Sequence, residues 1–254
     1  MSNQESLRIA AEQFERDGYT VIRNFYSADE AAELEQQVEQ YIAKTLPALE
    51  SRSAFYEDDD DPQTLFRLEH MQKYDPTFAA MLEDDTLRDV AANLLQDDAA
   101  PRDLQLFGKA PIVGHETPPH QDGFYFKLDP NEALTLWLPL DPTDEANGCI
   151  RYVRGSHRRG MRPHGVSKIF GFSQGVRDFS RNDIDLEDAI VAAPGDLIAH
   201  HSMTIHRADA NGSPRRRWAL GFVYYAARAQ PDIEALADQE RQVKDQWGSL
   251  GRKR

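Results

Sequence analysis

Residues 194–227 read PGDLIAHHSMTIHRADANGSPRRRWALGFVYYAA and set the pattern for the second half of the chain. This stretch holds two apolar runs, Leu197 to His201 and Arg217 to Ala227, and Pro, Gly, Asp and Asn lie around them. Short apolar or alternating runs between such turn residues predict β-strands. Further runs of this kind lie earlier in the chain, at Leu104 to Lys109, Ala133 to Leu140 and Ile150 to Val153.

The first part of the chain carries helix signals instead. A helix is expected from Ser6 to Asp17, because Gly18 can take the left-handed conformation that ends many helices. A capping box at Ser27 to Glu30 predicts the start of a second helix. The other expected elements are a short strand at Tyr19 to Ile22, a helix end at Pro47 and a third helical stretch from about Pro76 to Leu95.

Helices followed by many short strands predict a mainly β fold with flanking α-helices, a β-sandwich or jelly roll buttressed by the N-terminal helices. No repeat or Gly/Ser linker interrupts the sequence, so we expect a single domain over residues 1–254. Its expected parts are a helical N-terminal part at about 1–98, a jelly-roll core at about 100–229 and a C-terminal tail at 230–254. The long polar segment from about Arg158 to Asp188 is expected to form an excursion between strands, such as a lid or substrate loop.

The composition is that of a soluble globular protein, with 40% hydrophobic and 28% charged residues. A net charge of −14 disfavours binding to nucleic acid or anionic membranes, so a small molecule is the expected partner. No apolar run approaches the ~20 residues that span a bilayer. The polar start of the chain and the single cysteine, Cys149, predict a cytoplasmic protein without disulfides. The acidic run Glu57 to Asp61 is interpreted as a solvated loop. The oligomeric state is left open.

Three residues form a candidate metal site. His120 and Asp122 lie two positions apart, so on an extended chain both side chains point to one face. His206 follows the predicted strand at Leu197 to His201 and can supply a third ligand. Two histidines and one carboxylate leave adjacent positions open on a metal, which suits non-haem Fe(II) oxygenases. A lone H-x-D pattern is also common in structural positions.

A possible co-substrate site follows the second histidine. When 2-oxoglutarate chelates iron through its keto acid, its far carboxylate needs a planar bidentate donor, which arginine provides. Arg217 begins the strand after His206, and Arg215 and Arg216 would then lie in the preceding loop. On that strand Arg217, Ala219 and Gly221 share one face, and the small residues would leave space beside the arginine.

These residues resemble those of the phytanoyl-CoA dioxygenase family, which includes ectoine hydroxylase and related bacterial oxygenases. The resemblance extends to about Ala229 and implies a double-stranded β-helix, a cupin-like jelly roll, with flanking helices. It also implies Fe(II) bound by His120, Asp122 and His206, and 2-oxoglutarate bound by Arg217, with O2 consumed. The matching segments are FERDGYTVI (14–22), PHQD (119–122), Trp137, NGC (147–149), GSH (155–157), PGD (194–196) and residues 206–217.

The resemblance further places Trp137 and Lys109 at the 2-oxoglutarate site, with a core aromatic as the alternative for Trp137. Asp122 favours hydroxylation over halogenation, because halogenating relatives carry a small residue in its place. Ser156 and His157 are expected to be structural, and five other residues are possible substrate contacts or packing residues. These five are His200, His201, Phe124, Tyr125 and Tyr224.

The expected reaction is hydroxylation of an unactivated carbon in a small polar metabolite, such as an amino-acid derivative, a zwitterion or a phosphonate, with release of succinate and CO2. An acyl-CoA substrate stays open, although Arg158, Arg159 and Arg162 form the only evident basic cluster. A cupin-like protein that binds a metal or small ligand without 2-oxoglutarate chemistry is a second alternative.

Overall fold

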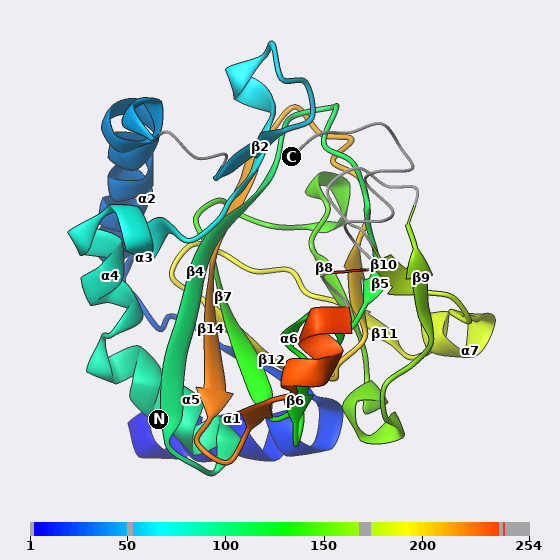
Figure 1. The fold of residues 1–254 in the computed structure, drawn as a ribbon. Coiled ribbons are helices and arrows are strands. Elements are labelled where there is room, and N and C mark those ends of the chain that lie inside the picture. The colour runs from blue at the N-terminus through cyan, green and yellow to red at the C-terminus, as the bar shows by residue number, and fades with distance from the viewer. Residues whose placement is uncertain (1–2, 50–52, 168–173, 239–240, 242–254) are drawn as a thin grey trace.

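Two antiparallel β-sheets face each other, and helices cover the outer side of the larger one (Figure 1). The computed structural model describes residues 3–49, 53–167, 174–238 and 241. The larger sheet has seven strands, in the order β1 (Tyr19–Ile22), β12 (Leu197–His201), β7 (Ala133–Pro139), β14 (Arg217–Ala226), β4 (Ala99–Lys109), β3 (Leu65–Leu68) and β2 (Ala54–Tyr56). The smaller sheet has the order β11 (Glu187–Ala189), β8 (Ile150–Val153), β13 (His206–Ala208) and β5 (Thr117–His120).

Two short strand pairs and several helices complete the described part of the fold. The pairs are β9 (His164–Val166) with β10 (Gln174–Val176), and β6 (Leu128–Asp129) with β15 (Gln230–Pro231). The helices are α1 (Asn3–Asp17), α2 (Ala28–Gln40), α3 (Met71–Tyr74), α4 (Pro76–Leu82), α5 (Asp85–Leu95), α6 (Gly123–Phe126) and α7 (Arg181–Ile184). No helix of the described segments is long and apolar enough to cross a membrane.

Strand β14 lies between the main hydrophobic core and the interior of the jelly roll, and each of its faces contacts one of them. Leu220, Phe222 and Tyr224 lie on the face toward the helices, in a large apolar cluster that includes residues of α1, α4 and α5. Ala219 lies on the other face and packs with Trp137 between the sheets. The alternation predicted from the sequence is confirmed, and so is the predicted jelly-roll fold class.

The helix predictions are confirmed with two refinements. Ser27 caps α2, and its hydroxyl accepts from the Glu30 amide at 3.3 Å while the Glu30 carboxylate accepts from the Ser27 amide at 2.7 Å. After Gln40 the helix continues as a π-helical turn, Tyr41–Thr45, and a 3-10 turn, Leu46–Ala48. The single helix expected at 76–95 is two helices, because Asp84 caps α5 by accepting from the Leu87 amide at 3.1 Å.

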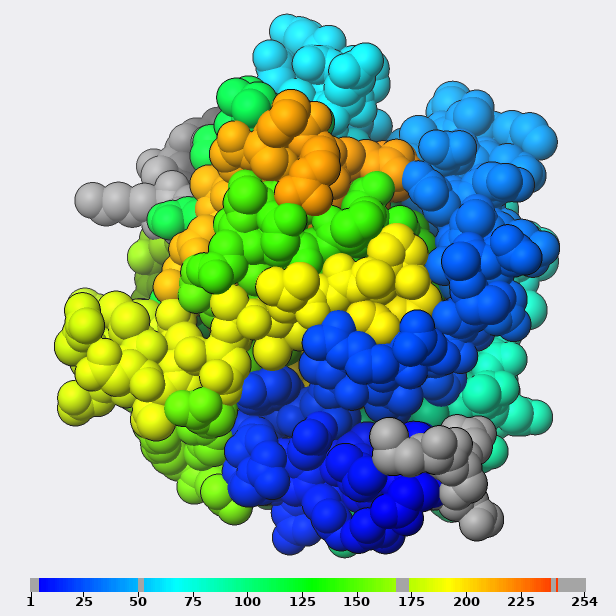
Figure 2. Space-filling model, turned by 180° about the vertical axis from the view of Figure 1, so that it is seen from behind, coloured from blue at the N-terminus to red at the C-terminus, as the bar shows by residue number. Residues whose placement is uncertain are grey.

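The expected helical N-terminal part contains strands as well as helices, and the strand expected at Tyr19 to Ile22 is β1. Strands β1, β2 and β3 all come from that part and join the larger sheet. Figure 2 shows part of this arrangement from behind, where the blue N-terminal segment lies against yellow residues of the later half of the chain, as the β1–β12 pairing requires. The expected excursion at 158–188 contains β9, β10, α7 and part of β11, and its residues 168–173 lie outside the described segments.

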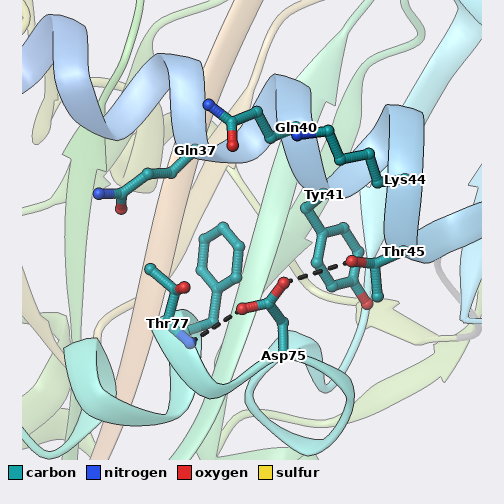
Figure 3. Close-up of a pocket in the computed structure, with 8 residues that line it drawn as sticks. Gln37, Gln40, Tyr41, Lys44, Thr45, Asp75 and Thr77 are labelled. Atoms are coloured by element: carbon teal, nitrogen blue, oxygen red, sulfur yellow. Dashed lines mark hydrogen bonds between the residues drawn. The ribbon is translucent and has the colours of Figure 1, made fainter.

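A polar hollow of about 90 Å³ lies between α2 and α4 on the outer, helical side (Figure 3). The residues at the bottom of this hollow contact one another and stabilise the fold. The Asp75 carboxylate caps α4 by accepting from the Thr77 amide at 2.8 Å, and its other oxygen accepts from the Thr45 hydroxyl at 3.3 Å. Tyr41 packs edge-on against Phe78, with ring centroids 5.3 Å apart. These contacts tie the π-helical turn after α2 to the start of α4.

Tyr224 was one of the possible substrate contacts, but it lies on the helical side of the sheet. Its buried hydroxyl donates to the Leu82 carbonyl at 2.9 Å. We predict that Tyr224→Phe lowers the free energy of unfolding by about 1 kcal/mol, because one buried hydrogen bond is lost. Urea unfolding measures the change. Activity should stay unchanged, and a loss of activity at unchanged stability would contradict this placement.

Candidate metal centre

Two histidines form a cross-strand pair in the smaller sheet. His120 on β5 lies opposite His206 on β13, and their ring centroids are 4.1 Å apart. His120 Nδ1 lies 2.8 Å from the Pro118 carbonyl oxygen, and His206 Nδ1 lies 3.0 Å from the Thr204 carbonyl oxygen. A carbonyl oxygen only accepts, so each Nδ1 carries the proton. Each Nε2 can therefore give its lone pair to a metal.

Asp122 completes the candidate site from the turn between β5 and α6. Its Oδ1 lies 3.5 Å from His120 Nε2 and 3.7 Å from His206 Nε2. Ligand atoms of the three residues all lie within 4.8 Å of one another. Two imidazole nitrogens and one carboxylate oxygen match the donor set of a non-haem Fe(II) centre, so the residues fit this metal.

The electrostatics of the three residues suit metal binding. Burial, together with the nearby His120, holds the pKa of His206 well below its usual value. Burial alone would raise the pKa of Asp122, but His206, His120 and His200 around the carboxylate keep that pKa well below its usual value. At neutral pH the site therefore presents a neutral His206 and an anionic Asp122, the forms that ligate metals.

Two facing rows of side chains surround Asp122. In the smaller sheet, Tyr152, His206 and His120 are cross-strand neighbours on β8, β13 and β5. In the larger sheet, Tyr19, His200 and Thr135 are cross-strand neighbours on β1, β12 and β7. Asp122 Oδ2 accepts from the Thr135 hydroxyl at 2.9 Å and lies 3.1 Å from His200 Nε2. His200 was only one of several possible substrate contacts in the sequence.

Arg217 lies on the inner face of the larger sheet and is 4% exposed. Its guanidinium carbon lies 5.4 Å from the centroid of the Trp137 ring. No described carboxylate forms an ion pair with it, and its Nε has no hydrogen-bond partner among the described residues. Burial lowers the pKa of Arg217 to about 10. A buried, unpaired guanidinium fits the carboxylate of an anionic ligand.

The two preceding arginines lie in the loop before β14 and point elsewhere. Arg215 donates to Asp144 at 2.7 Å on the surface. Arg216 pairs with Asp141 at 3.0 Å and also with Glu35, and it stacks over the Trp218 ring at 3.8 Å. Of these three arginines, only Arg217 faces the interior.

Lys109 lies opposite Arg217 in the strand register and is 3% exposed. Its ammonium donates to the His115 carbonyl, and burial followed by the Arg217 charge lowers its pKa to about 7. Lys109, Arg217 and Thr117 line a cavity of about 30 Å³. Gly148 has a φ of +77°, and a Cβ there would lie 2.4 Å from the Asp209 carbonyl oxygen and 2.8 Å from Lys109 Cδ, so a glycine is required beside this lysine.

One predicted surface feature was partly wrong. The expected solvated run at Glu57 to Asp61 begins with a nearly buried side chain, because the Glu57 carboxylate accepts from the His115 amide at 2.9 Å and also contacts the His115 ring. The other four acidic residues of the run are exposed. Glu57 therefore closes one side of the cavity that Lys109 and Arg217 line.

Gln121, between the two candidate ligands of the H-x-D motif, is a site residue that the sequence did not reveal. It is 0% exposed, and its amide donates to the Met203 carbonyl at 2.7 Å and the Gly160 carbonyl at 3.1 Å. Its side-chain oxygen accepts from the Arg162 amide at 2.8 Å. Gln121 thus ties the 158–188 excursion to the metal centre.

Two of the possible substrate contacts line a wall beside His120. The Tyr125 ring meets the His120 ring edge-on at 6.4 Å, and the Tyr125 hydroxyl donates to the Gln174 carbonyl at 2.9 Å. The Phe124 ring stacks on His164 of β9, with centroids 4.3 Å apart. The excursion therefore supplies part of this wall.

His201, Ser156 and His157 lie in structural positions. His201 bonds to Glu132 at 3.3 Å and packs against the Phe14 ring. The Ser156 hydroxyl accepts from the Ile205 amide at 2.8 Å, and His157 Nε2 lies 3.1 Å from the Glu15 carbonyl oxygen.

The sequence profile of the phytanoyl-CoA dioxygenase (PhyH) family matches residues 14–219. The chain belongs to this family. Membership confirms the resemblance drawn from the sequence and the predicted enzyme class, a dioxygenase. The matched range includes His120, Asp122, His206 and Arg217.

Curated relatives are similar over most of their length. Phytanoyl-CoA dioxygenase domain-containing protein 1 from Bos taurus is 23% identical over 83% of this chain and 87% of its own. A probable alpha-ketoglutarate-dependent hypophosphite dioxygenase from Stutzerimonas stutzeri is 26% identical over 84% of this chain and 77% of its own.

Solved structures share the fold. The epimerase SnoN, in complex with Fe3+, alpha ketoglutarate and nogalamycin RO, superposes with a TM-score of 0.73 at 20% identity, covering 92% of this chain and 90% of its own. EctD from S. alaskensis with bound Fe superposes with a TM-score of 0.71 at 24% identity, covering 89% of this chain and 77% of its own.

We predict that Gln121→Ala lowers the free energy of unfolding by about 2 to 3 kcal/mol, because buried carbonyl and amide groups lose their partner. Urea unfolding measures this change. Limited trypsin digestion should also cut faster at Arg158, Arg159 and Arg162, since the excursion loses its tie. Gln36→Ala removes an exposed glutamine of α2 and is the control. Equal stability and cleavage in both variants would contradict the role of Gln121.

Proposed function

We propose that this protein is an Fe(II)- and 2-oxoglutarate-dependent dioxygenase that hydroxylates an unactivated carbon of a small polar metabolite and releases succinate and CO2. The observation that carries the proposal is the pairing of two features. His120, His206 and Asp122 converge as a metal donor set, and Arg217 is buried without a carboxylate partner among the described residues. A protein that only bound metal would have no use for such an arginine.

Each residue has a role in this proposal. His120, His206 and Asp122 hold Fe(II), and Arg217 binds the far carboxylate of 2-oxoglutarate with its planar guanidinium. Lys109 adds a second positive charge beside that carboxylate. Trp137, stacked against Arg217, limits the directions in which the guanidinium can point. Bound Fe(II) and 2-oxoglutarate supply the oxidative chemistry.

The chain itself orients the reactants and excludes water. The backbone carbonyls of Pro118 and Thr204 fix the tautomer and ring orientation of the two histidines. Apolar residues between the sheets, including Ile198 and Ala219, keep the inner space dry, which strengthens each charge interaction there. Phe124 and Tyr125, beside His120, are proposed to bound the substrate space.

Two of the three arginines in the basic cluster that a coenzyme A ester would need are already paired with carboxylates. Arg162 pairs with Asp178 at 3.0 Å and Asp183 at 3.2 Å, and Arg159 lies 3.8 Å from Asp183. These pairs leave little positive charge for the phosphates of the coenzyme, so we favour a small substrate over an acyl-CoA. A relative named for hypophosphite, and EctD solved with 5-hydroxyectoine, are consistent with this choice.

We predict that anaerobic addition of Fe(II) and 2-oxoglutarate produces the weak visible charge-transfer band of the chelate, and that His206→Ala abolishes it. Arg217→Ala should keep Fe(II) binding but weaken 2-oxoglutarate binding by about 10- to 100-fold, because charged hydrogen bonds of ~1.5–3 kcal/mol are lost. Titration of the band measures both constants.

The matched control is Arg215→Ala, which removes a surface arginine paired with Asp144 from the same loop. It should bind 2-oxoglutarate like the wild type. Metal binding without a band in the wild type would contradict the 2-oxoglutarate proposal and favour a cupin-like binding protein. An equal loss in both arginine variants would contradict the role of Arg217.

We further predict that 2-oxoglutarate binding weakens as pH rises through about 7. Burial beside Arg217 lowers the pKa of Lys109 to about 7, so the lysine is charged below this pH and neutral above it. The charged form attracts the co-substrate carboxylate, and the neutral form does not. Lys109→Met should bind weakly at both ends of the range and lack this pH dependence. Titrations of the charge-transfer band at several pH values measure the 2-oxoglutarate dissociation constant. An equal pH dependence in Lys109→Met would exclude Lys109 as its cause.

A further inference from the structure

The two oxygens of the Asp122 carboxylate have different surroundings. Oδ1 faces the Nε2 atoms of His120 and His206, at 3.5 Å and 3.7 Å. Oδ2 lies on the opposite side, 2.9 Å from the Thr135 hydroxyl and 3.1 Å from His200 Nε2. One oxygen therefore points to the metal position and the other is held by the larger sheet.

The hydrogen-bond chain assigns the tautomer of His200. A carboxylate oxygen only accepts, so His200 Nε2 carries a hydrogen and donates it to Asp122. In the neutral ring Nδ1 then accepts, and the Tyr152 hydroxyl lies 2.9 Å from it. Burial and the nearby Asp122 charge raise the pKa of Tyr152 well above its usual value, so that hydroxyl keeps its proton and donates.

The strand register holds both donors in place. His200 on β12 lies directly opposite Thr135 on β7, and β1 covers the other side of β12 with Tyr19 opposite His200. The Tyr19 ring stacks on Tyr152 from the facing sheet, with centroids 4.7 Å apart and planes 15° apart. His200, Thr135 and Tyr152 are all buried. Because these three side chains are packed on all sides, each has few other orientations available.

We infer that His200 is a positioning residue for the metal centre: with Thr135 it holds Asp122 Oδ2, so that the carboxylate offers the metal only Oδ1. The inference rests on the proposed function, because it requires Asp122 to be a metal ligand. A carboxylate that turned both oxygens to the metal would fill a position that the co-substrates need. His200 itself is not a ligand in this arrangement, since its Nε2 is directed at Asp122.

The test uses Co(II), whose visible absorption reports the number and geometry of its ligands, added to the metal-free protein without 2-oxoglutarate. His200→Leu should weaken Co(II) binding by about 10- to 100-fold, the range found when partners of metal ligands are removed. It should also change the Co(II) spectrum, because Asp122 Oδ2 can then turn to the metal. His200→Gln retains an amide donor and should recover the wild-type spectrum.

The control is His201→Gln, which changes the next residue of β12, whose ring bonds to Glu132 and not to Asp122. It should leave Co(II) affinity and spectrum unchanged. If His200→Leu does not fold, Thr135→Val removes the second donor with little change in volume and should show the same spectral change.

A wild-type spectrum in both His200→Leu and Thr135→Val would overturn the inference. So would a His200→Gln spectrum that matches His200→Leu, because His200 would then act as a ligand rather than as a donor to Asp122. Failure of the wild-type protein to bind Co(II) would instead contradict the proposed function itself, and the two failures are therefore distinguishable.

Discussion

The charge of a carboxylate that lies largely buried between two β-sheets must be compensated, and the surroundings of Asp122 meet that constraint. Its charge is costly away from water unless hydrogen bonds or opposite charges surround it. The smaller sheet places His206 and His120 on one side of it, and the larger sheet places His200 and Thr135 on the other. Both rows depend on strand register, and a slip of one residue would turn every side chain in a row to the opposite face.

The same constraint explains how the larger sheet divides its two faces. Its outer face is apolar and packs against the helices, which provides most of the hydrophobic core. Its inner face carries two pairs of polar side chains. His200 and Thr135 lie beside the Asp122 carboxylate, and Arg217 and Lys109 form a cross-strand pair on β14 and β4. Burying two cations side by side costs free energy that only an anion can recover. The inner face therefore sacrifices stability for binding, as functional sites commonly do.

The sequence predicted the strands and helices whose residues follow a clear local pattern. The strands at 133–140, 150–153, 197–201 and 217–227 are long or strongly apolar, so their signals are clear. Strand β5 was missed because TPPH contains two prolines and no apolar run, and β13 is only three residues long. These two strands carry candidate ligands, His120 and His206, whose residue types and spacing were the stronger signal.

The contacts that could not be predicted are those set by tertiary register. Nothing near His200 in the sequence indicates that it lies opposite Thr135, or that Tyr152 approaches it from the other sheet. Gln121 was missed for a related reason, because glutamine usually lies at the surface and its burial here depends on carbonyls of distant segments. Sequence pattern predicts which face a side chain occupies, whereas its partners depend on how the strands are paired.

The pairing of β1 with β12 also constrains the order in which the chain can fold during synthesis. The ribosome releases Tyr19–Ile22 well before its partner strand, Leu197–His201, because the two strands lie far apart in the sequence. Contacts so distant in sequence form slowly, because a long loop must close first. In that interval β1 has an unpaired edge that can bind to other chains. Until the strand that carries His200 has left the ribosome, the nascent chain therefore exposes an edge that favours aggregation.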